Sequence, residues 1–154
     1  MDDSVADFLS AVSGRWEGRA VHTPVGPFPY DIDFARDAEG CAAGVARPGS
    51  FHHRWQFCPA GDGLELEFLS DFGGNDQPLY LQLHGTDNDT FMFHSRTHAF
   101  LKVGARFEGE CLRLQVLHDD RLHVEIHLRR PASGTVACPW SVPAAPAPEG
   151  PGGT

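Results

Sequence analysis

Hydrophobic and polar residues alternate along most of the chain between Trp16 and Leu128. Successive side chains of an extended strand point to opposite faces, so each alternating segment predicts a strand with one buried and one solvated face. The segments lie at residues 16–22, 28–35, 51–57, 64–68, 79–84, 91–93, 100–107, 112–118 and 122–128. Turn signals such as Ala60-Gly61-Asp62-Gly63 separate them. The pattern predicts an all-β fold of about ten short antiparallel strands joined by tight hairpins.

A closed up-and-down β-barrel is the arrangement that this meander favours, because its connections are too short for the crossovers of a Greek-key sandwich. A barrel of about eight or more strands encloses enough room for one small ligand. Ahead of the strands, residues 2–13 predict a short helix that ends at Gly14. Its apolar residues recur at helical spacing and are Val5, Phe8, Leu9 and Val12.

The domain organisation follows from composition. Residues 1–131 are predicted to form the barrel, and residues 132–154 a disordered tail rich in Pro, Ala and Gly. The 154 residues are 41% hydrophobic and 21% charged, which is typical of one globular domain. The net charge of −9 argues against nucleic acid or an anionic membrane as partner, because both attract basic patches. A homodimer is left open.

Cellular location is predicted from the absence of two signals. No apolar run approaches the length of a membrane span, and residues 1–4 lack the basic start of a secretory leader. We therefore expect a cytoplasmic protein. The four cysteines, Cys41, Cys58, Cys111 and Cys138, lie far apart and include no C-x-x-C pair. In a reducing compartment they are expected to be free thiols.

The segment Gly14-Arg15-Trp16-Glu17-Gly18, placed directly after a short helix, resembles the start of calycin barrels. This superfamily includes lipocalins, fatty-acid-binding proteins and the haem-binding nitrobindins. The resemblance implies that Trp16 packs across the closed end of the barrel as a structural anchor. The W-x-G pattern is more similar to nitrobindins than to lipocalins, whereas residues 22–30 depart from the Gly-rich, Tyr-Pro-containing segment that nitrobindins carry there.

A second resemblance lies in the final strand, where the segment from His123 to Arg130 is similar to the closing strand of nitrobindins. The resemblance implies haem b as cofactor, His123 as the iron ligand, and nitric oxide binding or peroxynitrite isomerisation as the activity. Strict alternation instead places Leu122 and Val124 on the apolar face and His123 on the polar face. A β-bulge after Asp119-Asp120 would invert this assignment.

Six aromatic or imidazole side chains that alternation turns to the dry face are the candidate ligand-binding residues. They are Tyr30, His53, Trp55, Phe68, Phe93 and His118. His22 and Ser70 are predicted on the same face. An interior histidine can ligate haem iron or another metal, or act as a general base near neutral pH.

Three functions follow from this set. The first is binding of a small hydrophobic or planar ligand, with haem as the first specific candidate. The alternative is a small barrel enzyme (an isomerase, cyclase or lyase) that uses His53 or His118 as general base on an apolar substrate, with Tyr30 or Ser70 as partner. The third is an interaction module whose core is collapsed.

Overall fold

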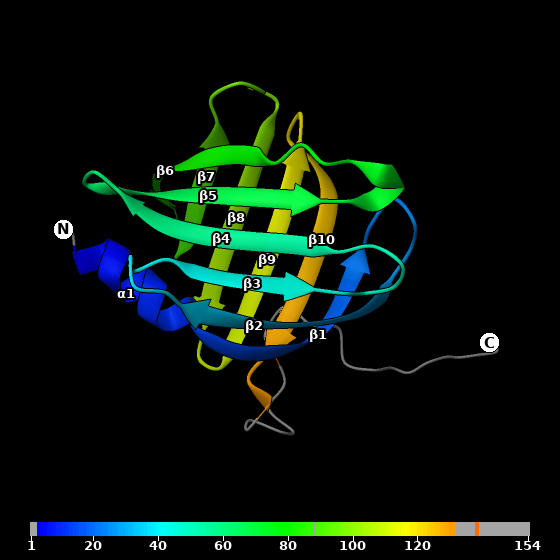
Figure 1. The fold of residues 1–154 in the computed structure, drawn as a ribbon, viewed down its shortest axis with the longest axis horizontal. Helices are drawn as coiled ribbons and strands as arrows, with labels where there is room; N and C mark the ends of the chain where they lie inside the picture. The colour runs from blue at the N-terminus through cyan, green and yellow to red at the C-terminus, as the bar shows by residue number, and fades with distance from the viewer. Residues whose placement is uncertain (1–2, 88, 132–137, 139–154) are drawn as a thin grey trace.

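The computed structural model describes residues 3–87, 89–131 and 138. Except for Cys138, the predicted tail at residues 132–154 lies outside the described residues. Within the described part of the chain, one α-helix precedes ten strands, with a short 3-10 turn between the fifth and sixth (Figure 1). The elements are α1 (Asp3–Val12), β1 (Gly14–His22), β2 (Phe28–Arg36), β3 (Ala42–Ala46), β4 (His53–Ala60), β5 (Gly63–Ser70), η1 (Phe72–Gly74), β6 (Leu79–Asp87), β7 (Thr90–Ser95), β8 (Leu101–Glu108), β9 (Cys111–His118) and β10 (Arg121–Arg129).

The ten strands form one closed antiparallel barrel in which each strand pairs with its neighbours in sequence and β1 pairs with β10. The predicted all-β, up-and-down barrel with a short N-terminal helix is confirmed. The fold is of the kind that the calycin resemblance implies. Inward-facing positions are buried at every second residue, as in β2, where Tyr30, Ile32 and Phe34 are buried between exposed neighbours. The alternation of the sequence thus records the inside and outside of the barrel.

Closure of the barrel between β1 and β10 depends on Gly18. This residue pairs with Leu128 on one side and with Tyr30 on the other. A Cβ atom at position 18 would lie 1.9 Å from the backbone oxygen of His127, which is far inside van der Waals contact. The strand crossing therefore requires glycine, and this is the physical reason for the glycine of the W-x-G pattern.

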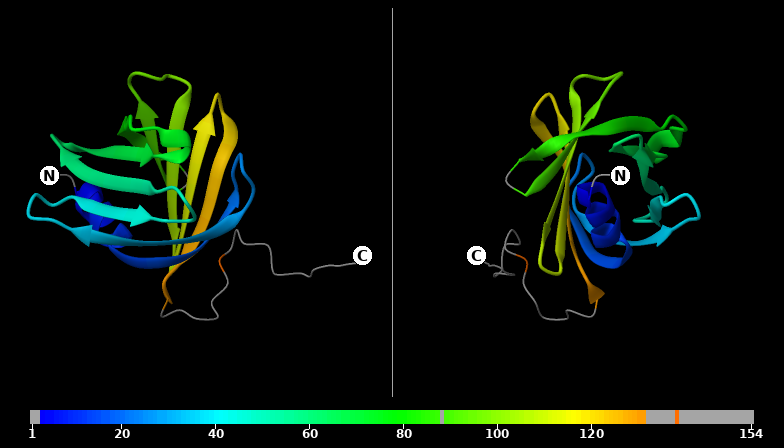
Figure 2. Two further views of the ribbon diagram at one scale, coloured as in Figure 1. Left: turned by 45° about the vertical axis from the view of Figure 1, so that its right-hand side comes forward. Right: turned by 90° about the vertical axis from the view of Figure 1, so that its left-hand side faces the viewer.

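One end of the barrel is closed by α1 (Figure 2, right). The buried indole of Trp16 donates a hydrogen bond from Nε1 to the backbone oxygen of Val12 at 2.8 Å, which ties the first strand to the helix. The guanidinium carbon of Arg130 lies 3.8 Å from the centre of the Trp16 ring. Trp16 is therefore placed where the resemblance implied, at the closed end.

The cysteines are paired, so the expectation of free thiols is wrong. Cys41 bonds to Cys58, and Cys111 bonds to Cys138. Cys41 directly precedes Ala42, which pairs with Phe57, so the antiparallel register brings Cys41 and Cys58 opposite each other. Distance along the chain hid this proximity because it depends on strand register. Disulfides persist in oxidising compartments. The pairing of these cysteines therefore gives no support to a reducing compartment.

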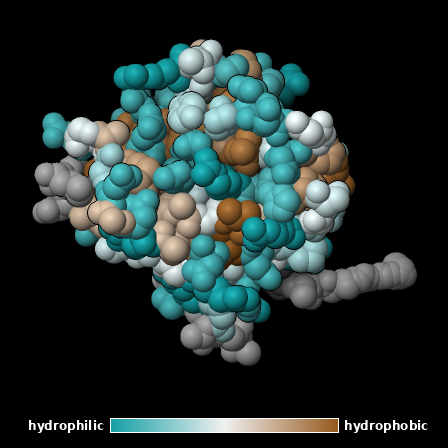
Figure 3. Space-filling view, in the orientation of Figure 1, coloured by the Kyte–Doolittle hydropathy of each residue, from teal (hydrophilic) through white to brown (hydrophobic). Residues whose placement is uncertain are grey.

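The outer surface contrasts with the apolar interior. On the face shown in Figure 3, hydrophilic residues predominate and hydrophobic residues form small, separate patches. Among the described residues, no helix has the length and apolar character needed to cross a membrane. Most of the large apolar side chains lie inside the barrel, in one core that extends from α1 to β10.

Gly18→Ala is expected to destabilise the barrel by about 3 kcal/mol, because the added methyl group collides with backbone rather than with a movable side chain. The matched control is Gly85→Ala, where an added Cβ meets nothing within 4 Å. Its cost should stay below about 1 kcal/mol. Denaturant unfolding followed by circular dichroism measures both values. Equal stabilities of the two variants would contradict the close approach at Gly18.

Candidate ligand-binding cavity

The end of the barrel opposite α1 holds an open cavity of about 320 Å³. In an antiparallel meander, even-numbered strands begin at the end where odd-numbered strands finish, so the cavity is built from the starts of β2, β4, β6, β8 and β10 and the ends of β5 and β9. The lining residues are Thr23, Pro24, Val25, Phe28, Phe51, His53, Phe68, Ser70, Phe72, Leu79, His98, Phe100, Leu101, Val116, His118, His123 and Val124. This volume lies at the lower end of the range for small-molecule sites.

Aromatic side chains make one wall of the cavity. The ring centre of Phe51 lies 5.7 Å from that of Phe28 and 5.2 Å from that of Phe72, both in edge-to-face geometry. Phe68 extends the wall inward and its ring lies 5.4 Å from that of His53. Such a wall offers dispersion and apolar contact rather than charge, which is typical of pockets for apolar ligands.

His53 and two residues beneath it form a buried chain of hydrogen bonds. Nε1 of Trp55 donates to the hydroxyl oxygen of Tyr30 at 2.8 Å, and the same hydroxyl lies 2.8 Å from Nδ1 of His53. Burial lowers the pKa of His53 to about 4, although the charge of Asp71 opposes the shift. Burial also raises the pKa of the Tyr30 phenol. All three side chains are therefore uncharged at neutral pH.

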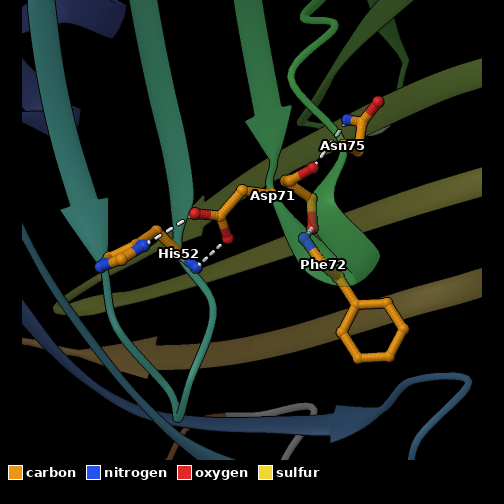
Figure 4. A network of polar contacts seen from close by, with 5 residues as sticks. His52, Asp71, Phe72 and Asn75 are labelled. Carbon is orange, nitrogen blue, oxygen red and sulfur yellow. Dashed lines mark hydrogen bonds and ion pairs between the residues drawn. The ribbon is translucent and has the colours of Figure 1, made fainter.

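A short turn after β5 forms one lip of the cavity (Figure 4). The Asp71 carboxylate accepts hydrogen bonds from the backbone N–H and from Nδ1 of His52, the latter at 2.8 Å. These two bonds lower the pKa of Asp71. The side-chain amide of Asn75 donates to the backbone oxygen of Ser70 at 2.7 Å. The turn is thus fixed to the residue that directly precedes β4, and the ring of Phe72 projects away from the His52–Asp71 pair.

Histidines gather on the opposite rim. A register shift between Leu122 and Val124 makes His123 the extra residue of a bulge in β10, so His123 and Val124 both line the cavity. Leu122, predicted on the apolar face, is instead 38% exposed. The ring of His118 lies 5.9 Å from that of His123 and 4.4 Å from that of Phe100. Partial burial, then the nearby His118 and His22, lower the pKa of His123.

The structure divides the six predicted ligand-binding residues into two groups. His53, Phe68 and His118 line the cavity, and so does His123, the predicted iron ligand. Tyr30, Trp55 and Phe93 are fully buried in the core and lie outside the lining. His22, predicted on a dry face, is exposed because the register of β1 shifts between Ala20 and His22.

Several lining residues were not among the predicted ones. Phe28 stands closer to the open end of β2 than the predicted Tyr30, Phe51 precedes the start of β4 at the same end, and Val116 shares the inner face of β9 with the predicted His118. Strand direction was available as a signal for them, because the starts of even strands and the ends of odd strands meet at one end. Phe72 and His98 lie on turns, where alternation gives no information.

Among the described residues, one group of three side chains that could ligate a metal converges, at Asp37, Glu39 and Cys41. The sulfur of Cys41 is bonded to Cys58, so it is not available to a metal. Comparison of the chain with protein-family models, with curated proteins and with solved structures found no match.

His53 is expected to make folding sensitive to pH. Its pKa rises from about 4 in the folded chain to about 6.5 when unfolded. As the pH falls from about 6.5 to about 4, only the unfolded chain takes up this proton, so about 3 kcal/mol of stability is lost in that window. Denaturant unfolding across this range should show a flatter profile for His53→Gln than for the wild type. His84→Gln, on an exposed residue of β6, is the control. Parallel profiles for wild type and His53→Gln would contradict the buried, neutral imidazole.

Proposed function

We propose that the cavity binds a small, largely apolar molecule. The observation that carries this proposal is the difference between the two ends of the barrel. The end that contains α1 is filled with buried side chains, whereas the opposite end keeps about 320 Å³ of space behind aromatic walls. Proteins seldom leave apolar space of this size unfilled, because each unfilled volume forfeits packing energy. Filling that space with a ligand supplies the missing contacts.

The hydrogen bonding of His53 does not favour the alternative in which it acts as a general base. A base is most effective when its pKa lies near the working pH, and the pKa of His53 is about 4. Its Nδ1 accepts a hydrogen bond from the hydroxyl of Tyr30, which with Ser70 was one of the two named partners, so this nitrogen is not free to take a proton from a substrate. His118 stands on the exposed rim of the cavity, in contact with solvent. Binding is thus better supported than catalysis.

An uncharged fluorescent probe tests this proposal. N-phenyl-1-naphthylamine should bind near one molecule per chain, with a rise in its emission on entering the cavity. Val116→Trp places a large side chain in the cavity and should weaken binding by about tenfold or more. Val45→Trp, on the outward face of β3, is the matched control and should bind as the wild type does. Failure of the wild type to bind, or equal binding by both variants, would contradict the proposal.

Haem is a second candidate ligand, favoured by the bulge that brings His123 to the cavity. Imidazole is a common axial ligand of haem iron, and His123 and His118 both offer it at the rim. The donor set therefore fits an axial ligand, and His123 is the one that the nitrobindin resemblance assigns. Bound haem would supply an iron centre for a diatomic gas or peroxynitrite. His53 suits this role less, because Nδ1 accepts a hydrogen bond from the Tyr30 hydroxyl, which leaves the ring proton on Nε2, the nitrogen that would have to bind iron.

Titration with hemin separates these ligands. The haem proposal expects saturation near one equivalent with a shifted Soret band, and loss of the shift in His123→Ala. His127→Ala is the control on the same strand, because His127 is paired with Glu125. Loss of the shift in His118→Ala but not in His123→Ala would assign the other rim histidine. Equal shifts in all variants, or binding without a defined stoichiometry, would exclude haem held by either residue.

A further inference from the structure

His53 differs from the other polar residues of the cavity lining in its depth. It is 6% exposed, whereas the remaining polar lining residues among those described are partly or fully exposed. Aromatic rings surround it, with Phe51, Phe68 and Tyr30 at 5.3, 5.4 and 5.6 Å between ring centres. A hydrogen-bonding group in such surroundings is shielded from water. Leaving it unpaired therefore costs free energy, and pairing it with a ligand atom stabilises the complex.

The proton on the His53 ring can be assigned from its neighbours. An indole N–H only donates, so the Tyr30 oxygen accepts the bond from Trp55. The Tyr30 hydroxyl has one hydrogen of its own, and its remaining partner is Nδ1 of His53. A fully buried hydroxyl hydrogen needs an acceptor, so Nδ1 accepts it. The proton of the neutral imidazole is therefore on Nε2.

The Nε2–H group faces the cavity. Nδ1 is turned toward the buried Tyr30, and the second ring nitrogen points away from the first. Within the described part of the chain, Nε of Arg106 is the buried side-chain nitrogen or oxygen that lacks a partner. Nε2 of His53 has no hydrogen-bond partner of its own among the described residues but is not one of these buried atoms, so it is accessible from the cavity that His53 lines. His53 thus places an oriented, neutral hydrogen-bond donor on the inner wall of the cavity.

We propose that this donor selects the ligand: the cavity takes apolar molecules that carry one uncharged acceptor, a carbonyl or ether oxygen, seated against Nε2–H of His53. This rests on the proposed function, since it assigns the ligand class of the same site. Ser70 stands directly opposite His53 on β5 and adds a hydroxyl to the same wall.

A charged headgroup fits the site less well than a neutral one. The lining includes no Lys or Arg among the described residues, so a carboxylate entering it would lose its hydration without gaining a cation. The negative charge of Asp71 is felt at His53 and would repel an anion. Because the pKa of His53 is low, its ring stays neutral at physiological pH and does not supply the missing positive charge. Ketones, esters and ethers satisfy the donor without this cost.

The proton assignment is tested directly on the wild-type chain. Long-range ¹H–¹⁵N NMR correlations distinguish the protonated from the unprotonated nitrogen of a histidine ring. At neutral pH, His53 should show a protonated Nε2 and an unprotonated Nδ1. Tyr30→Phe removes the hydroxyl that fixes this state and should shift His53 toward a mixture of the two forms. Tyr80→Phe, at the exposed tyrosine of β6, should leave the spectrum unchanged. A protonated Nδ1 in the wild type would overturn the proposal.

The selectivity is tested with acetophenone and cumene, which differ by a carbonyl oxygen in place of a methyl group. Each competes with N-phenyl-1-naphthylamine, and the ratio of their affinities is compared between wild type and His53→Leu. The greater hydrophobicity of cumene cancels in this comparison. In the variant, the affinity for acetophenone relative to cumene should fall by about three- to tenfold, which is the effect of losing one neutral hydrogen bond. Benzoate, the charged analogue, should compete more weakly than acetophenone in the wild type.

The outcomes separate this inference from the proposed function. If the probe binds and the ratio is the same in wild type and His53→Leu, the cavity binds apolar molecules without reading an acceptor, and the inference falls alone. If benzoate competes better than acetophenone, the assigned ligand class is wrong. If the probe does not bind the wild type, the proposed function fails and the inference fails with it.

Discussion

Phe8 of α1 packs into the barrel against four phenylalanine rings, and the position of any ligand depends on this contact. Its ring centre lies 4.8 Å from that of Phe57, 5.0 Å from Phe91, 5.4 Å from Phe107 and 5.8 Å from Phe93. Ten strands enclose more volume than their own side chains fill. The helix occupies that volume at one end only. The space left at the other end is the cavity, and its walls are the strand termini that meet there.

The polar groups of the interior also differ between the end closed by α1 and the end that holds the cavity. At the closed end, the indole of Trp16 satisfies a helix carbonyl. At the level of the cavity floor, Trp55 and Tyr30 direct their hydrogen bonds toward His53. In the hydrogen-bonded series Trp55–Tyr30–His53, each polar group has a partner except Nε2 of His53, which faces the cavity. An apolar pocket with an oriented donor recognises both shape and a polar atom. The fold thus provides the space for a ligand, and the hydrogen bonds from Trp55 through Tyr30 to His53 orient the donor that selects among ligands.

The alternation of the sequence predicted the barrel and nine of its ten strands, because burial imposes a period of two on a strand. It missed β3 (Ala42–Ala46), whose small apolar residues show no polar alternation. It did not predict depth along a strand, so Tyr30 and Trp55 were expected in the cavity whereas Phe28 and Phe51, nearer the mouth, line it. It also failed at bulges, because the extra residue of a bulge interrupts the period of two. His123 reaches the cavity for this reason. The nitrobindin resemblance pointed to His123 where the strict period of two did not.

The central claim is that a ligand enters the end of the barrel opposite α1. Intermolecular nuclear Overhauser effects between bound N-phenyl-1-naphthylamine and the methyl groups of the protein test it most directly. The account predicts contacts with Leu101, Val116 and Val124, which line the cavity, and none with Val5 of α1. Contacts with Val5, or with outward-facing methyl groups such as those of Val45, would contradict it.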